Sequence, residues 1–257
     1  MTAKMSPEAG SYGGTAPAVA ARGVSCEDWP VKVDIYSDVV CPWCYLGKRR
    51  FEAALADFAG RDEVEIEWKP FQLDPSAPEA PESAVASLGA KVGGEEQART
   101  AMAHVTKLAA EDGLNYDLPN ARIVNTFTAH RLLWWAGAKA GRDVQSALTE
   151  RLFAAHLTET ADLSDHATLA ALAADVGLDG AADFLASDDG VEEVKEAIGE
   201  ARALGIESVP TYVFDERWAV SGAQSAEIFR DLLDQVANAT IGSDAGEGGC
   251  CGGGCCG

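Results

Sequence analysis

Apolar and polar residues alternate from residue 31 to residue 36, and this pattern predicts a short strand. Val31, Val33 and Ile35 fall on one face, while Lys, Asp and Tyr fall on the other. A helical pattern follows and ends near Gly60, because glycine suits the residue just past a helix. The apolar stripe of this helix has the spacing i, i+3, i+4, i+7 and consists of Phe51, Ala54, Leu55 and Phe58.

A second alternating run predicts a half-exposed strand directly after this helix. Val64, Ile66 and Trp68 alternate with glutamates, and we expect the strand to continue to Leu73. A strand, a helix and a strand of these lengths indicate a parallel pair joined by a right-handed crossover. Residues 74–94 are rich in Pro, Ala, Ser and Gly, so we expect a loop or linker there.

The middle of the chain, from Glu95 to about Gly205, has an Ala-rich helical pattern and no convincing strand. Gly113, Gly141 and Gly177 stand just past three of the expected helix ends. We expect this block to form a small helical domain inserted into the sheet domain. The predicted helices span residues 95–112, 125–140, 143–157, 165–176, 180–187 and 191–204.

After this block the pattern returns to strands. Residues 205–214 and 218–222 predict a hairpin with its turn at Asp215 and Glu216. An amphipathic helix follows from Ser225 to about residue 238, and its apolar side carries Ile228, Leu232 and Val236.

These elements predict an α/β fold in five segments. Residues 1–29 lack periodicity and read as a disordered arm. Residues 30–76 form the first part of the sheet domain, and residues 77–204 form the linker and the helical insertion. Residues 205–240 complete the sheet domain, and residues 241–257 form a flexible tail rich in Gly and Cys.

The net charge of −21 comes from 41 acidic and 20 basic residues spread along the chain. A surface of this kind repels nucleic acid, so we expect no nucleic-acid partner. It suits a cytoplasm of high salt concentration, where repulsion between like charges is screened. The chain has no apolar run of about 18 residues, and residues 1–22 lack the apolar core of a secretory signal. We therefore expect a cytoplasmic protein that does not span a membrane.

The seven cysteines are distributed unevenly: none lies between residues 45 and 249. A disulfide-stapled secreted domain spreads its cysteines through the fold, so this fold is expected to stand without bridges. Cys26 lies in the N-terminal arm and reads as an incidental free thiol. The remaining cysteines are the pair Cys41 and Cys44 and the C-terminal group Cys250, Cys251, Cys255 and Cys256.

The pair Cys41 and Cys44 lies where the first strand passes into the first helix. Pro42 suits the first helical position, which puts Cys41 beneath the unpaired N–H groups of the helix N-terminus. This environment favours the thiolate form, and Cys44 lies about one turn further on. The pattern is typical of a redox dithiol, with Cys41 attacking and Cys44 resolving. Half of a structural zinc site and two packed thiols are the alternatives.

Several motifs together resemble the DsbA-type branch of the thioredoxin superfamily, and within it the FrnE-like group related to 2-hydroxychromene-2-carboxylate isomerase and glutathione transferase kappa. The resemblance extends from residue 31 to about residue 238 and implies a thioredoxin-like fold with an inserted all-helical domain. The motifs are Asp38-x-x-Cys41-Pro42-Trp43-Cys44-Tyr45-x-Gly47, Pro70-Phe71-x-Leu73, Asn125-Thr126-x-x-Ala129-His130-Arg131, Val209-Pro210-Thr211 and Ser221-Gly222-Ala223-Gln224.

The resemblance also implies a thiol–disulfide oxidoreductase that acts on protein or small thiols and needs no organic cofactor. Its catalytic residues would be Cys41 and Cys44. A cis Val209–Pro210 bond would turn the Val209 backbone toward a substrate strand, and an ordinary trans proline is the alternative. The other expected substrate-binding residues are Pro42, Trp43, Asn125 and His130. A structural role is an equal alternative for Asn125 and His130: Asn125 would cap a helix, and His130 would lie at the edge of the core.

Some residues depart from the family pattern. Ser208 and Asp74 replace a common Gly and a common Asn. The dipeptide between the cysteines is Pro-Trp rather than the Pro-His of strongly oxidising relatives, so no imidazolium lies beside Cys41, and its oxidising strength stays open. A small-thiol-dependent isomerase is the competing class, although those relatives carry Ser in place of Cys41.

The remaining candidate groups are less specific. The four C-terminal cysteines suit a soft metal such as zinc or Cu(I), or electron transfer to Cys41 and Cys44, and otherwise form an unstructured end. Three basic residues, Lys48, Arg49 and Arg50, either add positive charge near Cys41 or form a solvated face. The histidines at 104, 156 and 166 have no ligand spacing and read as surface or packing residues.

Overall fold

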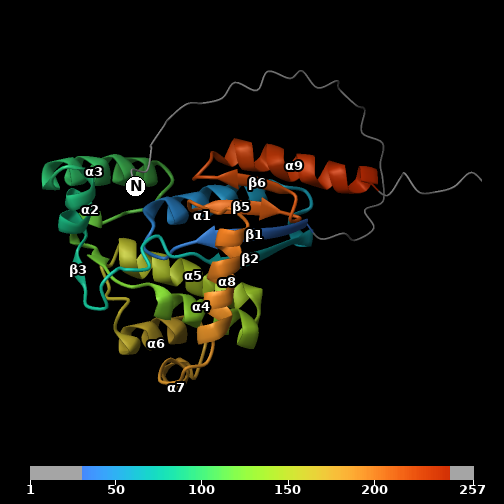
Figure 1. Cartoon of the computed structure of the whole chain (residues 1–257). Helices are drawn as coiled ribbons and strands as arrows, with labels where there is room; N and C mark the ends of the chain where they lie inside the picture. Colours follow the sequence, from blue (N-terminus) through green and yellow to red (C-terminus); the bar gives the residue numbers. More distant parts are fainter. Residues whose placement is uncertain (1–30, 244–257) are drawn as a thin grey trace, which may run out of the picture.

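A mixed four-stranded sheet forms the centre of the structure, a computed structural model that describes residues 31–243 (Figure 1). The strand order is β2-β1-β5-β6, and the strands are β1 (Val31–Ser37), β2 (Val64–Pro70), β5 (Thr211–Phe214) and β6 (Trp218–Ser221). The first pair is parallel and the other two pairs are antiparallel. The parallel unit and the hairpin that we predicted are therefore confirmed, although β2 ends at Pro70 rather than Leu73.

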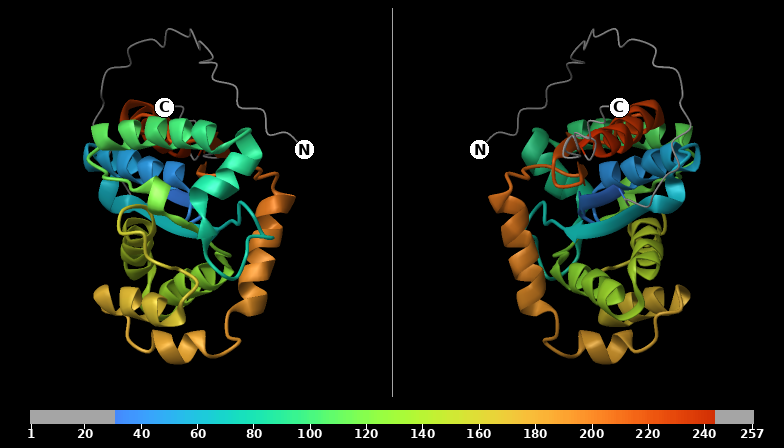
Figure 2. Two further views of the ribbon diagram at one scale, coloured as in Figure 1. Left: turned by 90° about the vertical axis from the view of Figure 1, so that its left-hand side faces the viewer. Right: turned by 90° about the vertical axis from the view of Figure 1, so that its right-hand side faces the viewer.

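Helices cover both faces of this sheet. In Figures 1 and 2, α9 lies on one side of the sheet and α4 to α7 lie on the other. The helix α8 leads from α7 back toward the sheet. The helices are α1 (Pro42–Ala56), α2 (Ala84–Val92), α3 (Glu95–Glu111), α4 (Phe127–Ala140), α5 (Arg142–Leu157), α6 (His166–Asp175), α7 (Ala181–Leu185), α8 (Val191–Ala203) and α9 (Ala226–Ser243). Two short 3-10 turns, Arg61–Glu63 and Leu118–Asn120, complete the connections.

The apolar core consists of two large clusters. One cluster joins the sheet to α1, α2, α3 and α9, and it includes Ile35, Phe51 and Tyr212. The other cluster lies among α4 to α7 and includes Leu132 and Leu148. The helices α4 to α7 therefore pack around a centre of their own, whereas α3, the first helix of the Ala-rich block, packs with the sheet.

Three sequence predictions were wrong. Residues 74–94 contain a helix, α2, because Ser83 caps its first turn and Gly93 ends it in a left-handed conformation. The predicted all-helical block contains a short strand, β4 (Arg122–Ile123), which pairs with β3 (Glu82–Ser83). The buried face of α9 is rotated from the predicted one, because Ile228 is exposed and the buried residues are Phe229, Leu233 and Val236.

A side-chain amide closes the outer edge of β2. The Trp68 backbone N–H donates to Gln145 Oε1, and Gln145 Nε2 donates to the Trp68 carbonyl, each at 3.2 Å. The last residue of the strand is Pro70, which has no N–H to donate and is tolerated at an edge. Gln145 belongs to α5, so this pair of bonds ties the sheet to the helices beyond it.

Candidate active site

Cys41 lies at the N-cap of α1, as the sequence predicted. The strand β1 ends at Ser37, and the backbone then turns so that the Cys41 N–H donates to the Asp38 carbonyl at 3.0 Å. Pro42 takes the first helical position, and the Cys44 N–H donates to the Cys41 carbonyl at 3.0 Å. This turn places Cys41 and Cys44 within the first turn of one helix, and both are free cysteines.

The two thiols differ in their surroundings. The Cys41 residue is 4% exposed, whereas Cys44 is 0% exposed. Burial raises the pKa of the Cys44 thiol well above its ordinary value, and the neighbouring Cys41 sulfur raises it further. The Asp38 backbone and the Ser37 hydroxyl act in the opposite direction. Cys44 is therefore held as a thiol at neutral pH.

The loop before β5 completes the surroundings of Cys41. The Val209–Pro210 bond is cis, as the resemblance implied. The Cys41 Sγ approaches the Val209 carbonyl oxygen at 3.8 Å. Because Gly47 has no side chain, α1 packs closely on this loop: a Cβ there would lie 3.0 Å from Pro210 Cγ and 2.6 Å from Tyr212 Oη.

Half-buried apolar residues adjoin Cys41 in the chain or pack on the same apolar cluster. Val40 and Pro42 are its neighbours in the chain, Trp43 follows them, and Val209 approaches from the loop before β5. The structure thus brings three of the predicted substrate-binding residues and the Cys41 thiol to one place, and Pro210 packs beneath them against α1.

Asn125 has a structural role in the described contacts. Its side-chain oxygen accepts from the Phe127 N–H at 2.9 Å, which closes a turn directly before α4, and from Gln72 Nε2 at 3.0 Å. Its amide nitrogen donates to the Pro75 carbonyl at 3.4 Å. These bonds hold the turn that leads into α4, and the N-cap of this helix is Thr126 rather than Asn125.

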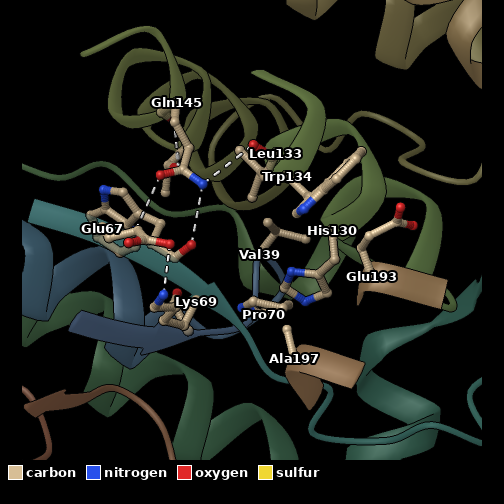
Figure 3. Close-up of a pocket in the computed structure, with 13 residues that line it drawn as sticks. Val39, Glu67, Lys69, Pro70, His130, Leu133, Trp134, Gln145, Glu193 and Ala197 are labelled. Carbon is tan, nitrogen blue, oxygen red and sulfur yellow. Dashed lines mark hydrogen bonds and ion pairs between the residues drawn. The ribbon is translucent and has the colours of Figure 1, made fainter. Parts of the chain in front are cut away.

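His130 lies beside Asp38, and the two side chains are buried together. His130 is 3% exposed and Asp38 is 1% exposed, and 3.4 Å separates His130 Nε2 from Asp38 Oδ1. The other Asp38 oxygen accepts from the Leu73 N–H at 2.8 Å. His130 lines a cavity on the outer edge of β2, and Cys41 is not among the residues that line this cavity (Figure 3).

The three basic residues of α1 are paired with carboxylates. Lys48 is buried and contacts Glu52 and Glu150, and Arg49 donates to Glu150 at 2.7 Å. Arg50 donates to Asp112 and to the Ala223 carbonyl, each at 2.9 Å. These residues therefore join α1 to neighbouring elements and do not form a solvated face.

Sequence reasoning missed several residues of this region. The Tyr116 hydroxyl donates to the Pro42 carbonyl at 2.8 Å, which holds the first turn of α1. The Tyr45 hydroxyl donates to Glu150 at 2.6 Å. Burial raises the pKa of both tyrosines, so both stay protonated as donors. Both partners are far away in the chain, so no local pattern indicates these contacts.

Of the three histidines that we assigned to the surface or to packing, two lie on the surface and one is packed in the interior. His104 and His166 are exposed, while His156 is buried and packs in α5. Burial lowers the pKa of His156 to about 4, although the nearby Asp38 carboxylate favours its charged form. His156 is therefore neutral at pH 7.

Residues 31–243 contain no group of three or more His, Cys, Asp or Glu side chains arranged to hold a metal ion. The four C-terminal cysteines and Cys26, on which we placed the metal and redox hypotheses, lie outside the described residues. Within the same range, no helix is long and apolar enough to cross a bilayer.

Comparison with known proteins gives consistent matches. The family model of the DSBA-like thioredoxin domain matches residues 32–234. The crystal structure of a probable DsbA oxidoreductase from Streptomyces coelicolor, 36% identical, covers 81% of this chain and 90% of its own, with a TM-score of 0.75. The uncharacterized protein YwbO of Bacillus subtilis (strain 168) is 29% identical over 210 residues, which are 79% of this chain and 96% of YwbO. A 2-hydroxychromene-2-carboxylate isomerase shares the fold at 18% identity, with a TM-score of 0.59 over 83% of this chain and 98% of its own.

Proposed function

The chain belongs to the DSBA-like thioredoxin domain family, and from this premise we propose that it is a thiol–disulfide oxidoreductase working through Cys41 and Cys44. The match confirms the resemblance to DsbA-type proteins and the thioredoxin-like α/β fold that the sequence predicted. We assign attack to Cys41 and resolution to Cys44 because the two thiols differ in position and burial. Cys41 lies at a helix N-terminus beside a half-buried apolar surface, whereas Cys44 is fully buried with a raised pKa.

The reaction has two exchange steps. The Cys41 thiolate attacks one sulfur of a substrate disulfide, which forms the mixed disulfide and releases the other substrate sulfur as a thiolate. Cys44 then loses its proton and attacks the Cys41 sulfur, so the Cys41–Cys44 disulfide forms and the second substrate thiolate leaves. The substrate is reduced by two electrons and the protein is oxidised by two. With a dithiol substrate the same steps run in reverse from the oxidised protein, so the Cys41–Cys44 disulfide is reduced as the substrate is oxidised by two electrons.

The loop before β5 serves as the docking edge for the substrate backbone. The Val209 carbonyl lies beside the Cys41 sulfur, and Val209 and Trp43 are half-buried apolar residues at the same place. A peptide that adds as an extended strand obtains its affinity from main-chain hydrogen bonds and its selectivity from such side chains. Protein disulfides and small disulfides both fit this arrangement.

Trapping of the mixed disulfide tests the assignment. We expect Cys44→Ser to accumulate an adduct on Cys41 with glutathione disulfide, identified by peptide mass mapping of the full chain. Cys41→Ser should form no such adduct on Cys44 and should lose turnover in insulin reduction. Turnover that persists in Cys41→Ser contradicts the proposal. Isomerisation that depends on a small thiol and is unchanged in Cys44→Ser supports the isomerase class instead.

We also assign the protein to the FrnE-like group and to a cytoplasm of high salt concentration. The group assignment is supported by the motif around Cys41, and the location by the absence of cysteines between residues 45 and 249. The net charge of −21 supports the salt-rich environment. Unfolding in dilute and multimolar KCl tests the last assignment, and equal stability in both contradicts it.

A further inference from the structure

One peptide group connects Tyr116 to the start of α1. The Tyr116 hydroxyl donates to the Pro42 carbonyl at 2.8 Å, although the two residues are 74 positions apart in the chain. The same peptide group carries the N–H of Trp43, because the carbonyl of one residue and the N–H of the next belong to one planar amide. A hydrogen bond at this carbonyl therefore acts on the N–H that opens the helix.

The Trp43 N–H is an unpaired donor at the helix start. Pro42 takes the first helical position and has no N–H, and the Cys44 N–H donates to the Cys41 carbonyl at 3.0 Å. The Trp43 N–H makes no hydrogen bond to any residue of the range 31–243. The usual acceptor for the N–H of a second helical position is the side chain of the N-cap residue, and the N-cap residue here is Cys41. The Trp43 N–H is thus the donor available to a Cys41 thiolate.

The Cys41 sulfur needs such a donor when it ionises. As a thiol it approaches the Val209 carbonyl oxygen at 3.8 Å and makes no hydrogen bond that caps the helix. A carbonyl oxygen accepts from a thiol, but its negative end repels a thiolate. The dipeptide between the cysteines contains Trp43 and no histidine, so no imidazolium lies there to offset this repulsion. The ionisation of Cys41 therefore depends on the N–H groups at the helix start.

Tyr116 reaches the peptide group from a fixed position. Its ring lies 6.0 Å from the Tyr45 ring at an interplanar angle of 28°, and the Tyr45 ring stacks on Phe153 at 5.2 Å. The next residue, Asp117, donates its N–H to the Leu157 carbonyl at 2.7 Å. Burial raises the pKa of Tyr116 well above its ordinary value, so the hydroxyl stays protonated as a donor.

We propose that Tyr116 is a positioning residue that strengthens the Trp43 N–H as a donor to the Cys41 thiolate, through the bond from its hydroxyl to the Pro42 carbonyl. This inference rests on the proposed function and names a residue that tunes the nucleophile of that reaction. A donor at a carbonyl draws electron density from the amide, so the N–H of the same amide becomes more positive. Hydrogen bonds in such a chain strengthen one another. The bond also fixes the orientation of this amide within the first turn of α1.

The pH profile of Cys41 alkylation tests the proposal. Reduced full-length protein is treated with iodoacetamide at a series of pH values, and peptide mapping gives the rate at Cys41 alone. In Tyr116→Phe, we expect the midpoint of the profile to rise by at least about 0.2 unit, which slows alkylation below the midpoint by a factor of about 1.6 or more. The limiting rate at high pH should stay within about twofold of the parent, because the thiolate itself is equally accessible in both proteins.

Tyr45→Phe is the matched control. It removes the hydrogen bond of another buried tyrosine hydroxyl at the same helix, the bond to Glu150 at 2.6 Å, and leaves the Pro42 carbonyl paired. We expect its midpoint to shift by less than half of the shift in Tyr116→Phe. A shift in Tyr116→Phe of less than about 0.2 unit overturns the proposal. A control shift of half or more of that in Tyr116→Phe also overturns it, because both variants then act by loosening α1.

3-Fluorotyrosine at position 116 provides a second test, which also serves if Tyr116→Phe does not fold. Fluorine makes the phenol a stronger donor at nearly the same volume, so the midpoint should fall, and an unchanged or raised midpoint overturns the proposal. The proposed function itself fails if the parent Cys41 ionises no more readily than a free cysteine, with a pKa of about 8.5, and Cys44→Ser forms no adduct with glutathione disulfide. A reactive parent Cys41 with an unshifted Tyr116→Phe profile rejects this inference alone.

Discussion

The carbonyl oxygen of Val209 lies 3.8 Å from the sulfur of Cys41, which precedes it by 168 positions in the chain. The contact joins the start of α1 to the loop before β5, so the reactive sulfur and the docking edge form one unit. Anything that moves α1 relative to this loop changes the path by which a substrate sulfur approaches Cys41. The position of Gly47 gives a direct way to test this relationship.

Gly47→Ala should reduce both stability and turnover. The new Cβ would lie 2.6 Å from Tyr212 Oη and 3.0 Å from Pro210 Cγ, so α1 and the loop must separate. We expect a loss of about 1–3 kcal/mol in the free energy of unfolding, as for other overpacked sites, measured by urea denaturation. Gly199→Ala in α8 is the matched control, because nothing lies within 4 Å of its Cβ. The control should be neutral or stabilising by up to about 1 kcal/mol. Equal stability of the two variants contradicts the close approach.

Cys44 should resist alkylation at pH values where Cys41 reacts. Its pKa is raised by burial and by the Cys41 sulfur, so the thiolate that alkylates is scarce at pH 8. We expect iodoacetamide to modify Cys41 first in the reduced protein, and Cys44 only after denaturation, as measured by peptide mapping. If Cys44 is modified as fast as Cys41 in the folded protein, burial does not suppress the Cys44 thiolate and the prediction is wrong.

His156 should make the protein sensitive to acid. Its folded pKa of about 4 lies below the ordinary value of 6.5, so the unfolded chain binds the proton more tightly. The stability from this residue is present above pH 6.5 and is lost as the pH falls toward 4, by about 3 kcal/mol in total. We expect His156→Met to lose less stability than the parent across this window, measured by urea denaturation at each pH. The exposed His166→Gln variant should follow the parent. Parallel pH curves for the parent and His156→Met would contradict the assignment.

Glu150→Gln should weaken the contact between α1 and α5. The carboxylate accepts from Tyr45 at 2.6 Å, Arg49 at 2.7 Å and Lys48 at 2.8 Å, and the Lys48 side chain is buried. We expect a loss of about 1–2 kcal/mol, less than for a fully buried ion pair, because Glu150 is about a third exposed. Glu192→Gln removes an exposed pair with Lys195 and should change the stability by at most about 0.5 kcal/mol. A Glu150 variant as stable as this control would show that the cluster contributes little.

The sequence predicted the elements whose patterns are local. The alternation at Val31 to Ile35 and the cysteine motif at the helix start indicated β1 and α1, and the resemblance indicated the cis bond before Pro210. The helix α2 was missed because Pro, Ser and Gly around it outweighed two valid signals, the Ser83 cap and the Gly93 end.

The groups around the thiols were harder to predict. His130 and Asp38 are distant in the chain, and so are Tyr116 and Pro42, so their contacts depend on how the helices return to the sheet. The motif around His130 singled out the residue, yet its partner became visible only in three dimensions. The buried state of Lys48 was likewise hidden, because a basic run at the start of a helix usually faces solvent.

The two hydrogen bonds between Gln145 and Trp68 have a consequence for how copies of the protein meet. An uncovered edge strand exposes unpaired N–H and C=O groups that can pair with another extended chain. Such pairing leads to edge-to-edge assembly and aggregation. Here one amide side chain satisfies both the donor and the acceptor that a foreign strand would use. The sheet therefore accepts no new strand at Trp68.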